Sequence, residues 1–206
     1  MFIKNEKPVK IIGFLESSMT QEYIEVFGKY GLEEFSAITP EEFFSIEEKD
    51  KYQYIIAMWF DMKLRTKVCH ALDELNLDCL TYISDSVYIF DSSKVGKGCF
   101  INHQCTVCWN TSIGNHCYFG IRSAIGHDTN LGRNNLLFSG AWIAGKVNTG
   151  ENCKFHFNSS VINNVNITDN VTLGAFSNIS KDAMKPGTYL GRIAKLMKSE
   201  PTDKDL

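Results

Sequence analysis

The stretch VCWNTSIGNHCYFGIRSAIGHDTNL, from Val107 to Leu131, repeats one pattern every six residues. The pattern continues in both directions, from Ile83 to Ile179. Every sixth position in this range carries a large apolar residue, with Thr149 as the one exception: Ile83, Ile89, Val95, Ile101, Val107, Ile113, Phe119, Ile125, Leu131, Leu137, Ile143, Phe155, Val161, Ile167, Leu173 and Ile179. Neither an isolated helix nor an antiparallel meander needs a period of six.

Two further columns keep the same register. Glycine follows the apolar residue at Gly96, Gly114, Gly120, Gly126, Gly132, Gly150 and Gly174, and a small side chain stands two residues before it, with Asn135 as the polar exception. Such a unit is typical of a parallel β-helix, whose coils bury a shared core only by stacking. Three hexapeptides close one triangular coil, so residues 18 apart are expected to stack at a spacing of about 4.8 Å.

The region before the repeats alternates between strand and helix patterns. Short apolar runs predict strands at 9–15, 35–38, 54–60 and 78–82, and capping residues predict helices at 17–30, from 39 onward and at 63–75. Asp61 is expected to cap the last helix, with Leu64, Val68, Leu72 and Leu75 on its buried face. This order implies a small parallel sheet covered by helices, and the strand ends of such sheets commonly form a ligand crevice.

Composition narrows the class of protein. The chain has 206 residues, a net charge of -3 and a pI near 6.0, which gives no reason to expect a nucleic acid partner. No run approaches the roughly 18 apolar residues of a membrane span, and the polar start is not followed by a signal-type segment. We therefore expect a cytoplasmic protein without a membrane span.

The cysteines and asparagines fit the repeat. Cys99, Cys105, Cys117 and Cys153 fall in the small column, which predicts buried packing rather than ligation, and the lone C-x2-C pair of Cys105 and Cys108 is a weak zinc signal. No metal is expected. Asparagine tolerates left-handed backbone, so corners are predicted at Asn102, Asn110, Asn115, Asn134, Asn135, Asn163 and Asn164. After Ile179 the register stops, and an extended piece is expected at 189–195.

Taken together, the repeats, the βαβ start, the string SAIGHDTNLGRNNLLFSGAWIAGKV (Ser123 to Val147) and the ending YLGRIAK resemble one family of left-handed β-helix acyltransferases, that of sialic acid O-acetyltransferases and bacillosamine-type sugar N-acetyltransferases. The resemblance covers nearly all of residues 8–196. It implies an α/β N-terminal βαβ domain followed by a left-handed parallel β-helix of hexapeptide repeats. The expected division is a small Rossmann-like βαβ domain at 1–82 that binds the acceptor, an acyltransferase domain at 83–196 and a polar tail at 197–206.

The same resemblance implies an activity and its residues. It predicts a homotrimer that transfers acetyl from acetyl-CoA, bound between adjacent prisms, to an amino or hydroxyl group of a nucleotide-linked sugar in bacterial surface-glycan synthesis. His127 matches the family's general base, Asp128 would fix its tautomer, and the main-chain N–H of Gly145 is the candidate oxyanion donor. An imidazole can accept a proton at neutral pH from an amine or hydroxyl that attacks a thioester.

Further residues are carried over from the family. Ala144, Gly145, Asn163, Gly191, Ala194 and Lys195 are expected beside the cofactor, and Gly13, Ser17 and Ser18 beside the acceptor. The chain departs from the family at two places. Leu136 stands where a second histidine is frequent, and Gly13 is followed by the acidic Glu16 instead of a Gly-rich turn that would admit a nucleotide-sugar phosphate.

Two other functions are compatible with a β-helix. A metalloenzyme of the γ-carbonic anhydrase kind needs three histidines on one metal, and the spacings of His103, His116, His127 and His156 lack that family's H-x4-H pair. His103, His116 and His156 are expected at the surface or at corners. A prism that binds sugar or assembles partners without catalysis is the remaining alternative.

Overall fold

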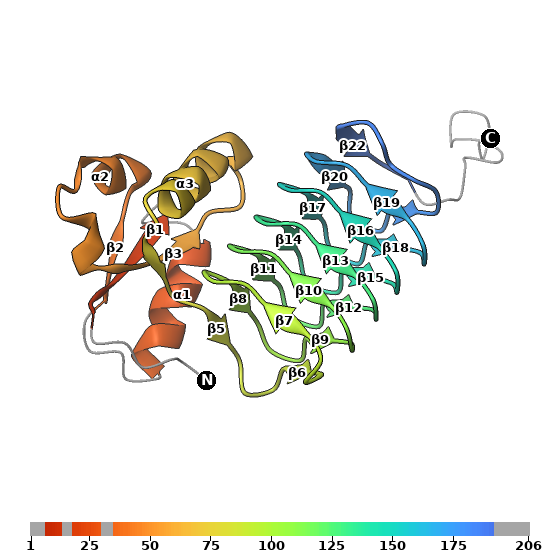
Figure 1. The fold of residues 1–206 in the computed structure, drawn as a ribbon, viewed down its shortest axis with the longest axis horizontal. Helices are drawn as coiled ribbons and strands as arrows, with labels where there is room; N and C mark the ends of the chain where they lie inside the picture. Colours follow the sequence, from red (N-terminus) through yellow and green to blue (C-terminus); the bar gives the residue numbers. More distant parts are fainter. Residues whose placement is uncertain (1–6, 14–17, 30–34, 192–206) are drawn as a thin grey trace, which may run out of the picture.

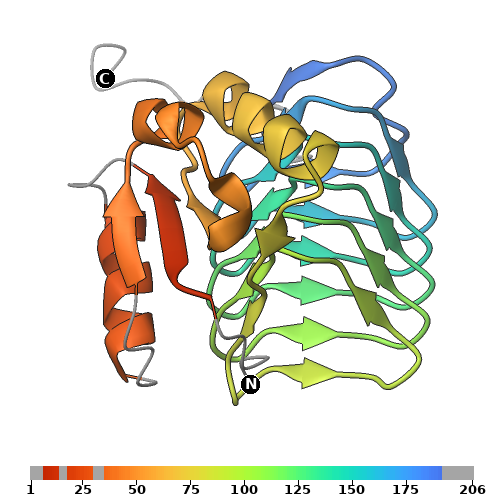
Figure 2. The same cartoon turned by 60° about the vertical axis from the view of Figure 1, so that its left-hand side comes forward.

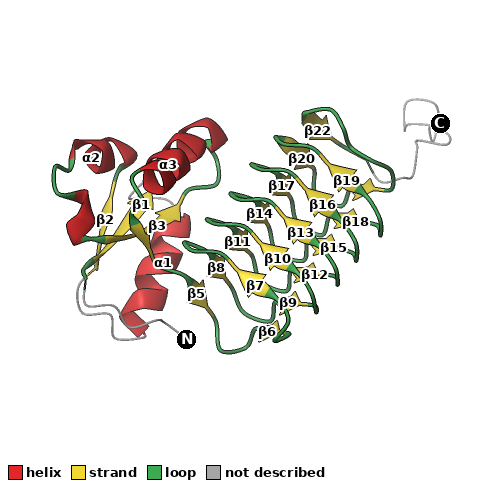
Figure 3. Cartoon of the chain, viewed as in Figure 1, coloured by secondary structure: helices red, strands yellow, loops and turns green. Residues whose placement is uncertain are grey.

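The computed structural model describes residues 7–13, 18–29 and 35–191. Figure 1 shows two parts side by side, a small layered unit of helices and strands and a prism of stacked coils. The described helices all belong to the N-terminal unit, and the prism consists of short strands joined by turns (Figure 3). None of these helices is long and apolar enough to cross a lipid bilayer.

A four-stranded parallel sheet forms the centre of the N-terminal unit. Its strand order is β2-β1-β3-β4, with β1 at Val9–Gly13, β2 at Phe35–Ile38, β3 at Gln53–Ala57 and β4 at Asp78–Cys79. The helical segments are α1 at Ser18–Lys29, α2 at Pro40–Ser45, the 3-10 turn η1 at Lys49–Lys51 and α3 at Met62–Glu74. The expected parallel sheet with helices is therefore confirmed.

Capping residues fix two of the helix starts as expected. Thr39 accepts a hydrogen bond from the Glu42 amide at 3.2 Å, and the Glu42 carboxylate accepts one from the Thr39 amide at 2.7 Å. Asp61 accepts from the Leu64 amide at 2.9 Å at the start of α3. These bonds satisfy amides that have no partner inside the helix.

Three expectations for this unit need correction. β3 ends at Ala57 rather than Phe60, and the single strand expected at 78–82 is divided between β4 and β5 (Tyr82–Ile83), because the chain leaves one sheet there and enters the prism. The buried face of α3 includes Arg65, which is 1% exposed, whereas Leu75 is 57% exposed. Residues 14 and 15, expected in the first strand, lie outside the described residues.

Three parallel sheets form the sides of the prism. Sheet B contains β5, β8 (Phe100–Ile101), β11 (Tyr118–Phe119), β14 (Leu136–Leu137), β17 (Lys154–Phe155), β20 (Val171–Leu173) and β22 (Gly187–Tyr189). Sheet C contains β6 (Tyr88–Ile89), β9 (Thr106–Val107), β12 (Ala124–Ile125), β15 (Trp142–Ile143), β18 (Ser160–Val161) and β21 (Asn178–Ile179). Sheet D contains β7 (Lys94–Val95), β10 (Ser112–Ile113), β13 (Asn130–Leu131), β16 (Asn148–Thr149) and β19 (Asn166–Ile167).

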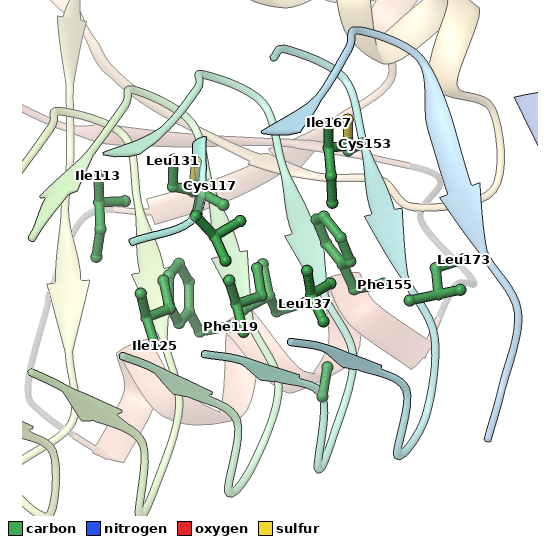
Figure 4. Packing of buried hydrophobic residues seen from close by; sticks show 14 of the residues in the cluster. Ile113, Cys117, Phe119, Ile125, Leu131, Leu137, Cys153, Phe155, Ile167 and Leu173 are labelled. Carbon is green, nitrogen blue, oxygen red and sulfur yellow. The ribbon is translucent and has the colours of Figure 1, made fainter. Parts of the chain in front are cut away.

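The coil length is 18 residues, as the period of six predicts. Ile125 pairs with Val107 in the preceding coil and with Ile143 in the next. The apolar column points into the prism, where residues such as Phe119, Ile125 and Leu137 form one continuous core (Figure 4). After Ile179 the spacing changes, because Leu173 pairs with Tyr189, 16 residues on. Of the extended piece expected at 189–195, Tyr189 lies at the end of strand β22. Residues 192–206 lie outside the described part of the chain.

Residues of the small column also serve as hydrogen-bond donors. Several donate to the carbonyl 15 residues later, as in Cys105 Sγ to Gly120 O at 3.1 Å, Thr111 Oγ1 to Gly126 O at 3.0 Å and Thr129 Oγ1 to Ala144 O at 3.1 Å. The four cysteines of this column are buried, as expected, and all seven cysteines are free. The column therefore combines donors with apolar residues such as Ala141 and Val147, and the property its members share is small size.

The corners of the coils have a left-handed backbone. Positive φ values recur at every sixth residue from Gly98 to Phe176, among them Asn110, Asn134 and Asn164. The corner prediction is confirmed for those asparagines. Asn115 and Asn163 also lie in the corner turns, each directly before the left-handed residue, and the prediction is wrong for Asn102 and Asn135, which lie outside the turns.

The N-terminal unit packs on sheet B (Figure 2). The ring of Tyr23 stacks on Phe100 with centroids 3.8 Å apart, and Trp59 makes edge contact with Tyr118 at 5.7 Å. Leu136, on the outer side of β14, is buried in the same cluster. The part of sheet B from β5 to β14 is therefore covered by the chain's own N-terminal unit.

A buried arginine joins the two parts beside this cluster. Arg65 donates to Ile56 O, Met58 O, His116 O and the Asn134 side chain at 2.6–3.1 Å. Each of these bonds uses an N–H of the guanidinium, so the side chain fixes the end of β3 against two corners of the prism.

Candidate active site

His127 directly follows Gly126 at the edge between sheets C and D. Its imidazole stacks on the indole of Trp109, one coil below, with ring centroids 4.9 Å apart and an interplanar angle of 5°. Phe90 supports the other side of the indole in an edge contact at 5.5 Å. The imidazole side chain is one-third exposed, so it can reach a ligand without unfolding of the prism.

Asp128 occupies the next, left-handed corner position and holds the imidazole by its edge. Its Oδ2 lies 2.8 Å from His127 Nδ1, and its Oδ1 accepts a bond from Asn110 Nδ2 at 2.6 Å. The hydrogen bond from Asn110, followed by that from His127, lowers the pKa of Asp128 below its usual value. An ionised Asp128 accepts a hydrogen bond from Nδ1–H, which keeps the proton on Nδ1 and leaves the lone pair on Nε2.

Gly145 lies on the coil above the imidazole. A Cβ at this position would approach His127 Nε2 to 2.7 Å, so a side chain here would displace the ring. The coil contact is fixed by the amide of Lys146, which donates to His127 O at 2.8 Å. No acceptor from the described ranges bonds to the Gly145 amide, which leaves that N–H for a ligand.

The two other carried-over residues of this edge accompany Gly145. Ala144 precedes it and is half-buried, and its amide donates to Val161 O at 3.0 Å. Asn163 is exposed one coil higher, where the neighbouring Asn164 amide donates to Gly145 O at 3.1 Å. The structure thus brings together His127, Asp128, Ala144, Gly145 and Asn163.

The remaining predicted site residues lie elsewhere. Gly191 is exposed, and its amide donates to Ser177 Oγ at 3.0 Å, at the other edge of sheet C and three coils above His127. Ala194 and Lys195 lie outside the described residues. Within one chain, Gly191 does not meet His127.

The predicted acceptor residues belong to the N-terminal unit. A Cβ on Gly13 would approach Thr20 Oγ1 to 2.5 Å and Ala57 O to 2.6 Å, so glycine is required here for close packing. Ser17 lies outside the described residues, and Ser18 begins α1. Because this unit packs on sheet B, Gly13 is separated from the His127 edge of the same chain by the prism.

The other histidines have distinct environments. His116 is at a corner, as expected, but it is buried, with Nε2 3.1 Å from Asp73 Oδ1. Burial lowers its pKa to about 4. The expectation of a surface or corner position is therefore met at His116 by a buried corner. His103 lies 2.6 Å from Ser84 Oγ, and His156 stacks on Phe138; both are half-buried.

One contact of the site was missed in the sequence. Asn110 holds Asp128, and the spacing of 18 residues between them was sufficient to find it. The described residues contain no group of three or more His, Cys, Asp or Glu side chains arranged to hold a metal ion.

Several solved structures share this fold, and the names of some of them state that they are acetyltransferases. The chain is similar to PerB from Caulobacter crescentus, solved with CoA and GDP-perosamine, at 19% identity and a TM-score of 0.76 over 87% of this chain and 91% of that one. It is also similar to the acetyltransferase domain of PglB from Neisseria gonorrhoeae, solved with acetyl coenzyme A, at 16% identity and a TM-score of 0.74 over 89% and 96% of the two chains.

A third similar structure is WeeI from Acinetobacter baumannii, at 16% identity and a TM-score of 0.69 over 90% of this chain and 97% of that one. No protein-family model matches the chain. At these identities the likeness shows the fold, and the predicted fold class, a βαβ unit followed by a left-handed parallel β-helix, is confirmed.

Proposed function

We propose that the protein is an acetyl-CoA-dependent acetyltransferase that modifies an amino or hydroxyl group of a nucleotide-linked sugar in bacterial surface-glycan synthesis. One observation carries the proposal: the His127 imidazole is stacked on Trp109 and held through Nδ1 by Asp128, so Nε2 is the nitrogen available to a substrate. The complexes with CoA and GDP-perosamine or with acetyl coenzyme A in proteins of this fold support the choice of donor and acceptor.

In the proposed reaction, His127 Nε2 removes the proton as the acceptor's nitrogen or oxygen attacks the thioester carbonyl. A new C–N or C–O bond forms, and the carbonyl oxygen becomes an oxyanion near the Gly145 amide. When the intermediate collapses, the C–S bond breaks and the imidazolium returns a proton to the CoA thiolate. Asp128 stabilises the imidazolium in between, and the amide of Gly145 stabilises the oxyanion.

A homotrimer is part of the proposal. The two edges of sheet C carry the His127 site and Gly191, respectively, and exposed apolar side chains occur on this sheet and its edges: Tyr88, Trp109, Ile121, Trp142, Phe157, Ile162 and Phe176. Three copies with sheet C at the common axis would cover this surface. They would also bring His127 of one copy near the N-terminal unit of the next, which we propose as the acceptor domain.

The cytoplasm is the proposed compartment, because acetyl-CoA is made there and the seven cysteines are free. We also propose that the acceptor-binding domain consists of residues 1–82.

The test is acetyl transfer by purified protein, read as free thiol release from acetyl-CoA with nucleotide-linked amino sugars, sialic acids and polysaccharide fragments as acceptors. His127→Ala should lose about 10²–10⁴-fold in kcat, the usual contribution of a general base. His70→Ala, an exposed histidine on α3, is the matched control and should retain full turnover. Near-normal turnover of His127→Ala with an unchanged thermal midpoint would reject the mechanism.

A further inference from the structure

The outer face of sheet D carries a continuous polar column next to the His127 edge. Lys94 pairs with Ser112, Ser112 with Asn130, Asn130 with Asn148 and Asn148 with Asn166 in successive coils. All five side chains are exposed. Their exposure means that the prism core does not require these polar groups.

Three side-chain amides of this column form a hydrogen-bonded ladder, in which each NH₂ group donates to the side chain on the coil above. Asn130 Nδ2 donates to Asn148 Oδ1 at 2.9 Å, Asn148 Nδ2 to Asn166 Oδ1 at 3.1 Å, and Asn166 Nδ2 to Asp182 Oδ2 at 3.3 Å. An ionised carboxylate can only accept, so Asp182 determines which way every amide above Ser112 points. The ladder therefore presents the Asn130 carbonyl oxygen at its lower end.

That carbonyl lies at a polar hollow of about 260 Å³ that reaches the catalytic carboxylate, lined by Ser92, Lys94, Asn110, Thr111, Ser112, Asp128 and Asn130. Within the described part of the chain, the Lys94 ammonium and the Ser112 hydroxyl have no hydrogen-bond partner. The hollow thus offers donors and an oriented acceptor in one small space. The carboxylate of Asp128 at its border disfavours an anionic ligand. Hydroxyl groups both donate and accept hydrogen bonds, so they can pair with the donors of Lys94 and Ser112 and with the carbonyl oxygen of Asn130.

We infer that this hollow binds hydroxyl groups of a saccharide, as the subsite that positions the acceptor sugar beside His127. The inference rests on the proposed function for the identity of the ligand. The sugar ring would lie against the outer face of sheet D, with its hydroxyls on Lys94, Ser112 and Asn130. The attacking group would then lie at the corner where Asp128 holds the imidazole.

The test uses D-glucosamine as the probe, titrated into the full-length protein and followed by amide and side-chain NMR resonances. We expect shifts at Ser112 and in the Asn130 side-chain amide. Ser112→Ala and Lys94→Gln should each weaken the apparent affinity about three- to tenfold, as expected for one lost hydrogen bond. Lys51→Gln, which removes an exposed charge from η1, is the control and should bind as the wild type does.

Asp182→Asn tests the ladder from a distance. The main-chain N–H of Asn166 donates to Asp182 Oδ1 at 2.9 Å. The side-chain amide introduced at position 182 would therefore keep its oxygen at this N–H and turn its NH₂ group toward the side chain of Asn166. All three amides would then reverse, and Asn130 would present a donor to the hollow. We expect weaker binding of D-glucosamine, by about three- to tenfold, although the changed residue lies about three coils away.

The outcomes separate this inference from the proposed function. Shifts in the hollow without any acetyl transfer would support the subsite and reject the enzyme. Acetyl transfer with acceptor KM unchanged in Ser112→Ala, Lys94→Gln and Asp182→Asn would reject the subsite and retain the enzyme. Shifts confined to the N-terminal unit would also overturn the inference.

Discussion

Asn135 donates a hydrogen bond from Nδ2 to the Thr149 hydroxyl at 2.9 Å, and these two residues are the exceptions in the two repeat columns. Asn135 also donates to Gly132 O and Gly150 O at 2.9 Å each, and its Oδ1 accepts from the Cys153 amide at 2.6 Å. The two departures thus bond to each other, with Asn135 buried and Thr149 half-buried. A polar group buried there without a partner would destabilise the fold.

A double-mutant cycle tests this pairing. Asn135→Cys should lower the free energy of unfolding by about 1–3 kcal/mol, because it leaves the buried Cys153 amide without its side-chain acceptor. Thr149→Val should lower it by about 0.5–1.5 kcal/mol, because it removes one of the three acceptors of Asn135 Nδ2. The double variant restores the regular columns and should lose less than the sum of the two. Urea unfolding at fixed protein concentration gives the four values. Additive losses would show that the two side chains are not coupled.

Trp109 should contribute to catalysis by orienting the imidazole. Aromatic stacking of this kind contributes about 0.5–1.5 kcal/mol, so Trp109→Ala should lower kcat/KM by about two- to tenfold. Trp109→Phe keeps a ring below His127 and should recover most of the activity. If the alanine and phenylalanine variants were equally impaired, stacking would not be the cause.

Gly145 should tolerate no side chain. The Cβ of Gly145→Ala would lie 2.7 Å from His127 Nε2, so the ring must move, and a displacement of this order can reduce the rate by about 10². Gly28→Ala on α1 is the matched control, since a Cβ there meets nothing within 4 Å. We expect kcat to fall in the first variant alone. Equal turnover of the two variants would contradict the steric role.

His116 should make stability depend on pH. Burial lowers its pKa from 6.5 to about 4, so between these values the unfolded chain binds more protons than the folded one. Stability should therefore be full above pH 6.5 and fall as the pH drops toward 4, by up to about 3 kcal/mol from this residue. Thermal midpoints of the wild type and of His116→Gln over this range give the measurement. Parallel curves would exclude His116 as the source.

The sequence was sufficient for the prism and for the neighbours of His127. A period of six determines which residues face the core and which lie 18 residues apart, so Trp109, His127 and Gly145 could be aligned before any coordinates were known. The alignment depends on backbone repetition alone. It would equally have identified Asn110 beneath Asp128.

The junction between the two parts could not be predicted in this way. Arg65 was not among the residues expected on the buried face of its helix, because an amphipathic pattern treats a charged residue as exposed. Its burial depends on carbonyls of β3 and of a prism corner, which come from distant segments with no shared period. His116 and Asp73 meet for the same reason.

The 18-residue coil also limits which insertions and deletions the site can tolerate. Removal of one hexapeptide between His127 and Gly145 would delete one strand and one core residue and would rotate all later coils by one third of a turn. Gly145 would then stand above a different side of the prism, and His127 would be covered by another corner. Losses or gains of whole coils preserve the stacking at the His127 edge, so length variation between related prisms should occur in steps of three hexapeptides or in loops that leave the corners unshifted.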